Sequence, residues 1–239
     1  FEEAKPEFIY QEDSGEATLL HWAAHGNASV DVVSYLLKYF EKAKPEFIYQ
    51  IDNYQRTALH YAAGNPSTDV LEYLTSYVEK QGRSDLIHLK DYFDMATLQH
   101  AIARGPASSV RFLVTKLPEV DYLDAQSSFR YYRSISKGST LVHLAADRGK
   151  LHNLQTLLEY GVEMDVLNES NKTALQVALE NNHHSIVEHL LNFGSDPTLR
   201  NKDGTRKGFV RVTHEKQFGP GCKKDDETPY EYAKRKGLL

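Results

Sequence analysis

A pair of histidines has the spacing of metal ligands. His21 and His25 lie four positions apart, so a helix would place them one turn apart on the same face. A structural zinc site needs a third and a fourth ligand, and none is evident in the neighbouring sequence. We therefore expect no metal site here and no bound cofactor.

A cysteine and a histidine near the C-terminus could form a thiol nucleophile and its base. Cys222 and His214 both lie in the short segment THEKQFGPGCKK. Gly219, Pro220 and Gly221 predict a surface loop there, which disfavours fixed catalytic geometry. The chain also has no phosphate-binding glycine loop, paired-cysteine motif or kinase signature. We predict that the protein is not an enzyme. The alternative, a cysteine-dependent enzyme, requires an activity that Cys222→Ser abolishes.

Composition and charge narrow the class of protein and partner. One cysteine among 239 residues allows no intrachain disulfide, which favours a cytoplasmic or nuclear location. No apolar run approaches the roughly 18 residues of a membrane helix, and the N-terminus has no signal pattern. Residues 205–239 carry nine Lys and Arg against five Asp and Glu, whereas the rest of the chain carries 19 against 28. Such an acidic body favours a protein partner with a basic or apolar segment over a nucleic acid.

Six short stretches of the chain share one pattern. They are TLLHWAA at 18, TALHYAA at 57, ATLQHAI at 96, TLVHLAA at 140, TALQVAL at 173 and TPYEYAK at 228. Apolar stretches with helical spacing, such as VDVVSYLL and SIVEHLL, follow the first five. The pattern resembles the ankyrin repeat, whose signature T-P-L-H-x-A-A precedes a second helix and a turn. The resemblance implies an all-α ankyrin-repeat solenoid of about six helix-turn-helix units, with β-hairpin finger loops and long insertions.

The repeat pattern divides the chain into units within a single domain at 1–239. We place them at residues 12–50, 51–89, 90–133, 134–166, 167–204 and 226–239, with an insertion at 205–226. One unit is too thin to bury its apolar face, so stacking must supply the core. The signature Thr is expected to cap the inner helix, and the resemblance implies that His21, His60 and His143 brace adjacent fingers. Trp22 is expected in the core, and His184 at a structural histidine position.

A duplicated segment points to the connections between units. AKPEFIYQ occurs at 4–11 and 43–50, and RSDLIHLK at 83–90 is its third counterpart. We interpret it as the link from an outer helix to the next finger. Phe1 then begins inside a repeat, and we expect the chain to be part of a longer protein.

Two long insertions differ in character. SSFRYYRSISKGS at 127–139 combines basic and aromatic residues, and KGFVRVTHEKQFG at 207–219 alternates enough to form a lengthened hairpin. Basic residues among aromatic ones can stack on nucleobases. Beside an acidic body we expect protein contacts instead, and the alternative is a solvated loop with no partner.

The ankyrin resemblance implies a non-enzymatic module that binds a partner protein through its concave face and finger loops. Two stretches are similar to I-kappa-B proteins. They are QVALENNHHSIVEHLLNFG at 176–194 and the lengthened first unit that leads into IYQIDNYQRTALHYAA. That likeness implies an intracellular regulator of signalling or transcription factors. The alternative is a targeting arm of a larger enzyme, effector or membrane channel.

The same resemblance selects a partner-binding surface at the finger tips and after the paired small residues of the inner helices. These residues are Asn53, Tyr54, Arg56, Tyr92, Phe93, Met95, Arg104, Lys137, Asp147, Arg148, Glu169, Lys172, Glu180 and Asn181. We expect Tyr54, Tyr92 and Phe93 to form an exposed aromatic ridge, because aromatic and Arg side chains are the usual interface anchors. The alternative is that these rings pack on the adjacent finger as part of the stack.

Overall fold

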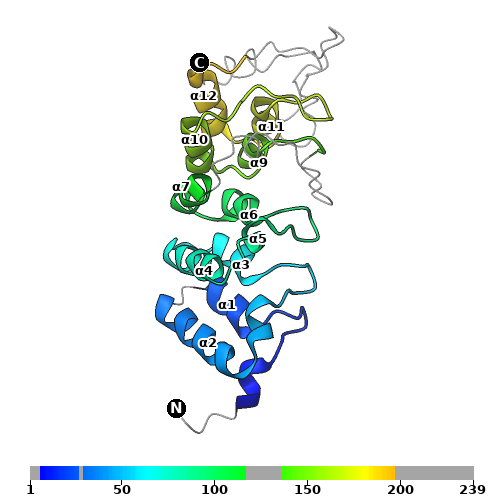
Figure 1. The fold of residues 1–239 in the computed structure, drawn as a ribbon. Helices are drawn as coiled ribbons and strands as arrows, with labels where there is room; N and C mark the ends of the chain where they lie inside the picture. Colours follow the sequence, from blue (N-terminus) through cyan, green and yellow to red (C-terminus); the bar gives the residue numbers. More distant parts are fainter. Residues whose placement is uncertain (1–5, 27–28, 117–135, 197–239) are drawn as a thin grey trace. The chain divides into compact units, whose positions relative to one another are not determined.

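The computed structural model describes residues 6–26, 29–116 and 136–196. They belong to two compact units, Phe1–Pro118 and Glu119–Leu239. In both units the helices come in pairs, a short inner helix followed by a longer outer one (Figure 1). The predicted all-α class and its helix-turn-helix units are confirmed.

Unit 1 contains three such pairs and three short connecting helices. The inner helices are α1 (Leu19–His25), α3 (Ala58–Ala63) and α6 (Thr97–Arg104). The outer helices are α2 (Val30–Ala43), α4 (Asp69–Lys80) and α7 (Ala107–Lys116). The connecting helices are η1 (Pro6–Tyr10), η2 (Pro45–Tyr49) and α5 (Asp85–His88).

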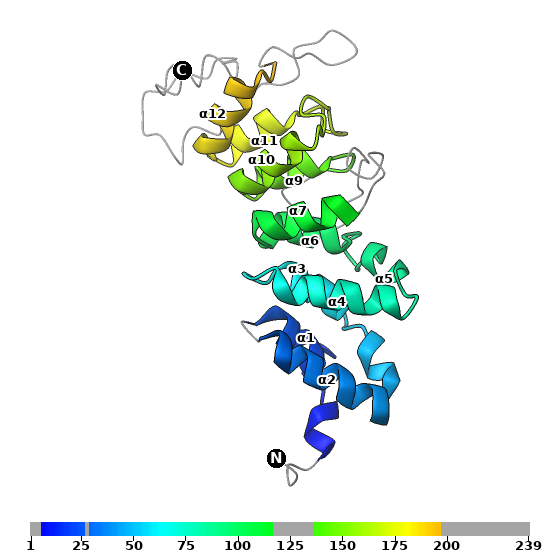
Figure 2. The same cartoon turned by 60° about the vertical axis from the view of Figure 1, so that its left-hand side comes forward.

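Unit 2 contains two pairs within its described residues. The inner helices are α9 (Leu141–Asp147) and α11 (Ala174–Glu180), and the outer helices are α10 (Leu151–Glu159) and α12 (His184–Phe193). Inner helix α9 packs on α11, and outer helix α10 packs on α12. Figure 2 shows the same helices from another side.

Small residues on the inner helices explain the close stacking. In unit 1, α1 packs on α3 and α3 packs on α6. Ala24, Ala62 and Ala101 are fully buried there, so the backbones of neighbouring repeats approach closely. At the end of α6 the approach is closest, because a Cβ on Gly105 would lie 2.2 Å from the Ala63 carbonyl oxygen. The outer helices bury larger residues such as Leu36 and Phe40, which complete the core.

The duplicated segment has the predicted role. The second copy forms η2 directly after α2 and buries Ile48, and its third counterpart forms α5 after α4, with Leu86 and Ile87 buried. The first copy forms the 3-10 helix η1, whose Tyr10 meets the Phe47 ring of the second copy edge-on at 5.1 Å. Both later copies therefore link an outer helix to the next finger.

The fingers are tight loops, where hairpin strands were expected. Within the described residues there is no β-strand, and only an isolated antiparallel bridge joins Glu12 to Thr18. In each loop a side chain takes up backbone N–H groups that a paired strand would otherwise bind. Among the residues described, no helix is long and apolar enough to span a membrane.

Candidate partner-binding surface

One side chain closes each finger loop. Asp52 Oδ1 accepts the backbone N–H groups of Tyr54 and Arg56, both at 2.8 Å. The chain reverses at Gln55, where φ is 60°, and the Asp52 N–H donates to the Arg56 carbonyl oxygen at 3.0 Å. The same two side-chain bonds, to the residues two and four positions later, are made by Asp13, Asp91 and Asn168. The backbone of each loop is thus held by one Asp or Asn side chain, and the side chains of the tip residues are not needed to close the loop.

Backbone bonds join each finger to the next within a unit. In unit 1 the Asn53 N–H donates to the Gly15 carbonyl oxygen at 2.9 Å, and the Tyr92 N–H donates to the Tyr54 carbonyl oxygen at 2.8 Å. In unit 2 the Glu169 N–H donates to the Lys137 carbonyl oxygen at 2.9 Å. The tips therefore present their side chains at fixed spacing along one edge of each unit.

Buried histidines brace neighbouring fingers, as predicted. His60 Nδ1 accepts the Thr57 N–H at 3.0 Å, which leaves Nε2 to donate to the Leu89 carbonyl oxygen at 2.9 Å. His21 and His143 make the same bridge, to the Arg56 and Lys172 carbonyl oxygens at 3.0 and 2.9 Å. Burial lowers the pKa of His60 to about 3 and also lowers the pKa of His21 and of His143. All three imidazoles are therefore neutral at physiological pH.

The third repeat has a different set of side-chain hydrogen bonds. Gln99 takes the histidine position and accepts the Ala96 N–H at 3.2 Å through Oε1. The imidazole is one residue later, where His100 Nε2 donates to Asp91 Oδ2 at 2.9 Å. Burial lowers the pKa of His100, so the buried ring stays neutral, and it meets the His60 ring edge-on at 5.1 Å. His100 therefore closes its own finger loop.

An aromatic ridge, Tyr54, Tyr92 and Phe93, lies on the fingers of the second and third repeats. The Tyr54 and Phe93 rings stack with centroids 5.7 Å apart, and Tyr92 meets Phe93 edge-on at 5.6 Å. Tyr54 is 46% exposed and Tyr92 is 49% exposed, while Phe93 is half-buried. The rings thus pack on the adjacent finger and still present a large apolar area to solvent.

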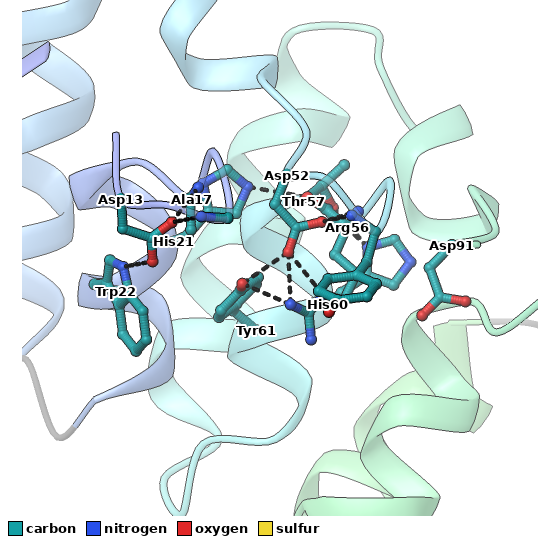
Figure 3. A network of polar contacts seen from close by, with 12 residues as sticks. Asp13, Ala17, His21, Trp22, Asp52, Arg56, Thr57, His60, Tyr61 and Asp91 are labelled. Atoms are coloured by element: carbon teal, nitrogen blue, oxygen red, sulfur yellow. Dashed lines mark hydrogen bonds and ion pairs between the residues drawn. The ribbon is translucent and has the colours of Figure 1, made fainter. Parts of the chain in front are cut away.

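Arg56 connects the ridge to the inner helices. Its guanidinium group binds Asp52 Oδ2 through Nε at 2.8 Å and donates from Nη2 to the Tyr61 hydroxyl at 2.9 Å (Figure 3). The same group lies over the Tyr54 ring at 4.9 Å and the Tyr61 ring at 4.8 Å. Burial would raise the pKa of Asp52, but the hydrogen bonds from Arg56 and Tyr61 outweigh burial and lower it. The arginine is therefore paired and held in one orientation.

The inner helices of unit 1 form a small cavity, here called the inner pocket, of about 190 Å³. It is lined by Trp22, His25, Arg56, His60, Tyr61, Gly64, His100 and Arg104. Trp22 was expected in the core, and this expectation is wrong, because the side chain is 50% exposed. On α1 the buried residues are Leu20, His21, Ala23 and Ala24, so Trp22 falls on the opposite face, where its Nε1 donates to Asp13 at 3.0 Å.

The corresponding surface of unit 2 is polar, and its charges are paired. Lys172 Nζ donates to Glu180 at 2.6 Å, and the Asn181 side-chain amide donates to Asp147 at 3.1 Å. Arg148 lies 3.3 Å from the Asp147 carboxylate. His183 Nε2 donates to the Asp147 carbonyl oxygen at 3.0 Å. The structural histidine at this turn is therefore His183, and the expectation for His184, which is exposed, is wrong.

The structure places most of the predicted partner-binding residues at the surface, with two exceptions. Met95 is fully buried, because it directly precedes the Ala96 cap of α6 and its N–H is held by Asp91 at 2.9 Å. Asp147 is only 8% exposed, since it accepts from Asn181 and pairs with Arg148. Both were expected to face outward, and both expectations are wrong. The exposed ones are Asn53, Tyr54, Tyr92, Arg104, Lys137, Glu169, Glu180 and Asn181, and the half-buried ones are Arg56, Phe93, Arg148 and Lys172.

The sequence interpretation placed only Arg56 and Arg104 of the eight pocket-lining residues in the partner-binding set and missed the other six. Trp22, His25 and Tyr61 form a cluster of rings on the inner helices, with the His25 and Tyr61 centroids 5.9 Å apart. Leu19, Trp22 and His25 recur at every third position of α1, and all three are exposed. That helical spacing was the signal that could have placed them on the surface.

The remaining predictions concern a metal site and segments near the C-terminus. His21 and His25 do not form a pair of metal ligands, since one ring nitrogen of His21 bonds to Thr18 and the other bonds to the Arg56 carbonyl oxygen. Among the residues the structure describes, no group of three His, Cys, Asp or Glu side chains could hold a metal ion. Cys222 and His214 lie outside the described residues, as do the insertion at 205–226, the unit at 226–239 and most of the loop at 127–139.

Comparison with known proteins supplies the family. The sequence matches the family described as "Ankyrin repeats (3 copies)" over residues 4–85 and 98–201. The chain is 34% identical over 93 residues to the ARF GTPase-activating protein Git of Drosophila melanogaster, covering 39% of this chain and 11% of that protein. It is 38% identical over 65 residues to the putative E3 ubiquitin-protein ligase XBAT34 of Arabidopsis thaliana, covering 27% of this chain and 17% of that protein. The chain thus spans less than a fifth of either relative.

Among solved structures, the ankyrin repeat domain of Bcl-3, titled a unique member of the IkappaB protein family, has a similar fold. The TM-score is 0.60 at 23% sequence identity, covering 83% of this chain and 79% of that one. The family match spans more than half of the chain, and the helix pairs, histidine bridges and finger loops follow the same repeat. The chain therefore belongs to the ankyrin-repeat family.

Proposed function

We propose that the chain is a non-enzymatic protein-binding module that holds its partner through the finger tips and inner helices of unit 1. The observation that carries the proposal is the aromatic ridge. Tyr54 and Tyr92 keep nearly half of their surface exposed although polar residues would serve solubility better. Exposed, rigidly held aromatic side chains beside an arginine are the usual anchors of protein interfaces.

Pre-organisation supports the same proposal. The finger backbone is fixed by Asp52 and Asp91, and Arg56 is held between two tyrosine rings. A surface that is already ordered loses little conformational entropy when a partner binds. We propose that the polar residues of unit 2, among them Lys137, Glu169 and Asn181, add rim contacts that contribute less.

The finer role is a proposal that rests on likeness. The fold shared with the Bcl-3 domain is compatible with I-kappa-B-like regulation of a signalling or transcription factor, which would place the protein in the cytoplasm or nucleus. The alternative is a targeting arm of a larger enzyme, effector or channel. It is favoured by two relatives, a GTPase-activating protein and a ubiquitin ligase, in which the matched region is a small part of the chain. The sequence that flanks residues 1–239 in the full gene product would separate the two.

The test compares partner capture by two immobilised variants. Tyr54, Tyr92 and Phe93 are replaced together by Ala, and the control replaces Tyr35 and Phe193, which are 61% and 53% exposed on outer helices. Partners captured by the wild-type chain are identified by mass spectrometry, and their affinity is then measured with purified protein. We expect the ridge variant to lose about 2 kcal/mol or more of binding free energy with a nearly unchanged melting temperature. We expect the control variant to bind normally.

Unchanged binding by the ridge variant would refute the proposal. If the triple variant unfolds, Tyr92→Lys provides a second test, because this side chain is half exposed and its replacement leaves the stacked Tyr54–Phe93 pair in place. That variant should fold and still bind more weakly than the wild type. A folded Tyr92→Lys variant with full affinity would count against the ridge.

A further inference from the structure

The inner pocket of unit 1 has the size of a single side chain. Its volume of about 190 Å³ is similar to cavities of about 150 Å³ that hold one benzene ring. All three inner helices contribute to it, with Trp22 from α1, Tyr61 from α3 and Arg104 from α6. A partner segment lying across the inner helices could therefore insert one residue here.

The charge of the lining is opposite in sign to that of most of the chain. Arg56 and Arg104 both line the pocket, and among the described residues no Asp or Glu does. Asp52 lies behind Arg56 and is 3% exposed. Its two oxygens are occupied by the backbone N–H groups of Tyr54 and Arg56, the Arg56 guanidinium and the Tyr61 hydroxyl. The carboxylate thus orients the arginine and presents no acceptor to a ligand in the pocket.

The walls of the pocket include aromatic rings that contact one another. Trp22 and Tyr61 lie with centroids 6.2 Å apart, and His25 meets both rings edge-on. Gly64 adds no side chain to the lining, although a Cβ there would make only an ordinary contact of 3.5 Å with the Arg104 Cβ. Such a site suits a side chain that has a short apolar stem and an anionic end.

We propose that the inner pocket receives the carboxylate side chain of a Glu or Asp in an extended acidic segment of the partner protein. This inference rests on the proposed function and adds the chemistry of the segment. Arg104 binds the carboxylate, Arg56 keeps its pair with Asp52 and adds a second guanidinium group at the pocket wall, and the side-chain methylenes lie against Trp22 and Tyr61. A carboxylate binds arginine through charge-assisted hydrogen bonds, whereas a Lys or Arg side chain would lie against the guanidinium groups of Arg56 and Arg104 and could not bind them in this way.

The proposal refines the expectation that an acidic body selects a basic segment. The summed charge of a protein acts at long range, mainly on the rate of encounter. Contact inside a pocket depends on the few side chains that line it. The acidic body of the chain therefore slows the encounter with an acidic segment, and the pocket arginines act on that segment only at contact.

Trp22 makes the pocket directly observable, because it is the only tryptophan of the chain and lines the pocket. The 239-residue protein is titrated with an acetylated and amidated hexaglutamate peptide while tryptophan emission is recorded. We expect a saturable change in emission that weakens with added salt. Amidated hexalysine and inorganic phosphate, at the same ionic strength, should produce no saturable change. No response to hexaglutamate, or an equal response to hexalysine or phosphate, would overturn the carboxylate assignment.

A matched pair of variants separates the pocket from general charge effects. Arg104→Gln removes a pocket cation, and Arg111→Gln removes an exposed cation on outer helix α7, outside the pocket. We expect hexaglutamate affinity to fall about tenfold in the first variant and less than about twofold in the second. Equal losses in both variants would mean that only net charge matters. Circular dichroism melting confirms that both variants fold.

The outcome is independent of the test of the proposed function. The titration needs no natural partner, so the pocket can bind hexaglutamate even if the ridge variant keeps full partner affinity. Conversely, the ridge variant could lose partner binding while hexaglutamate causes no change in tryptophan emission. That result would support the protein-binding module and reject the acidic segment as its ligand.

Discussion

The inner helices of the two units follow one repeat pattern and yet present different surfaces. In unit 1 the exposed side chains of these helices include Trp22, His25 and Arg104, which line the inner pocket. In unit 2 the surface around the inner helices holds the Lys172–Glu180 pair and the Asn181–Asp147 hydrogen bond. The same backbone therefore carries an aromatic surface in one unit and a polar surface with internal partners in the other.

This difference indicates where binding free energy would concentrate. A charged pair that is already satisfied must exchange its partner for a new one, so the net gain on binding is small. An exposed aromatic ring loses only its contact with water and gains apolar burial. We therefore expect unit 1 to contribute most of the affinity and unit 2 to contribute mainly stability and solubility.

The largest expected effect is a loss of unfolding free energy that should be similar in the two units. Leu36 in unit 1 and Leu190 in unit 2 are both buried on outer helices. Truncation of either to Ala should cost roughly 2 to 5 kcal/mol of unfolding free energy, through lost burial and the cavity that remains. Urea unfolding of each single variant provides the measurement. A loss below about 1 kcal/mol in one unit would show that its core is not packed as the other is.

The second prediction contrasts the finger-closing residues. Asp52→Ala removes all the hydrogen bonds to this side chain and leaves Arg56 without its carboxylate, so we expect a loss of about 3 kcal/mol. Asp52→Asn keeps a side-chain oxygen for the loop, as Asn168 does in unit 2, and should cost about 1 kcal/mol. The difference between the two variants, measured by thermal unfolding, isolates loop closure from the ion pair. Equal losses would mean that the loop does not depend on the side-chain oxygen.

The third prediction uses pH to separate the units. His60 has a pKa of about 3 in the folded protein, below its ordinary value of about 6.5. The unfolded chain therefore binds more protons below pH 6.5, and stability falls as the pH drops from about 6.5 towards 3. At pH 5 the loss from His60 alone is about 2 kcal/mol. Burial also lowers the pKa of His21 and His100 in unit 1 and, among the described residues of unit 2, of His143.

Amide hydrogen exchange at pH 7 and pH 5 can follow this effect in each unit. Acid should lower protection more in unit 1 than in unit 2. His60→Gln should reduce the pH dependence, since Gln99 and Gln176 already occupy this position in other repeats. Equal acid sensitivity of the two units, or an unchanged pH dependence in His60→Gln, would argue against the bracing histidines as its source.

The smallest expected effect concerns the polar surface of unit 2. Lys172→Ala and Glu180→Ala break an ion pair whose side chains are 36% and 32% exposed. Solvent screening limits such a pair to about 0.5 kcal/mol or less of stability. Partner affinity should also change little in either variant. A large loss of affinity in one of them would move the centre of binding to unit 2.

Repetition in the sequence explains why so much of the fold could be predicted. The signature Thr marks the start of inner helices α1, α3, α9 and α11, and the apolar spacing of stretches such as SIVEHLL places the outer helices. The bracing role of His21, His60 and His143 followed from the same family pattern. These features repeat because each one serves the stacking of neighbouring repeats.

The failures fall where a position departs from the pattern. Trp22 and Met95 were placed by alignment with a general repeat, which does not say whether an unusual side chain at that position faces the core or the solvent. In the third repeat the histidine lies one residue later than in the pattern, and His100 donates to Asp91. The inner pocket arises from three helices that lie far apart in the sequence, so no local pattern could indicate it.

The side-chain closure of each finger also bears on how such a protein can change over generations. Asp13, Asp52, Asp91 and Asn168 close the loops by accepting backbone N–H groups, so loop closure does not depend on which side chains the tip residues carry. Substitutions at Asn53 or Tyr92 can therefore accumulate without a matching change in the core. A lineage that keeps one acidic or amide residue per finger can acquire a new partner while its architecture stays the same.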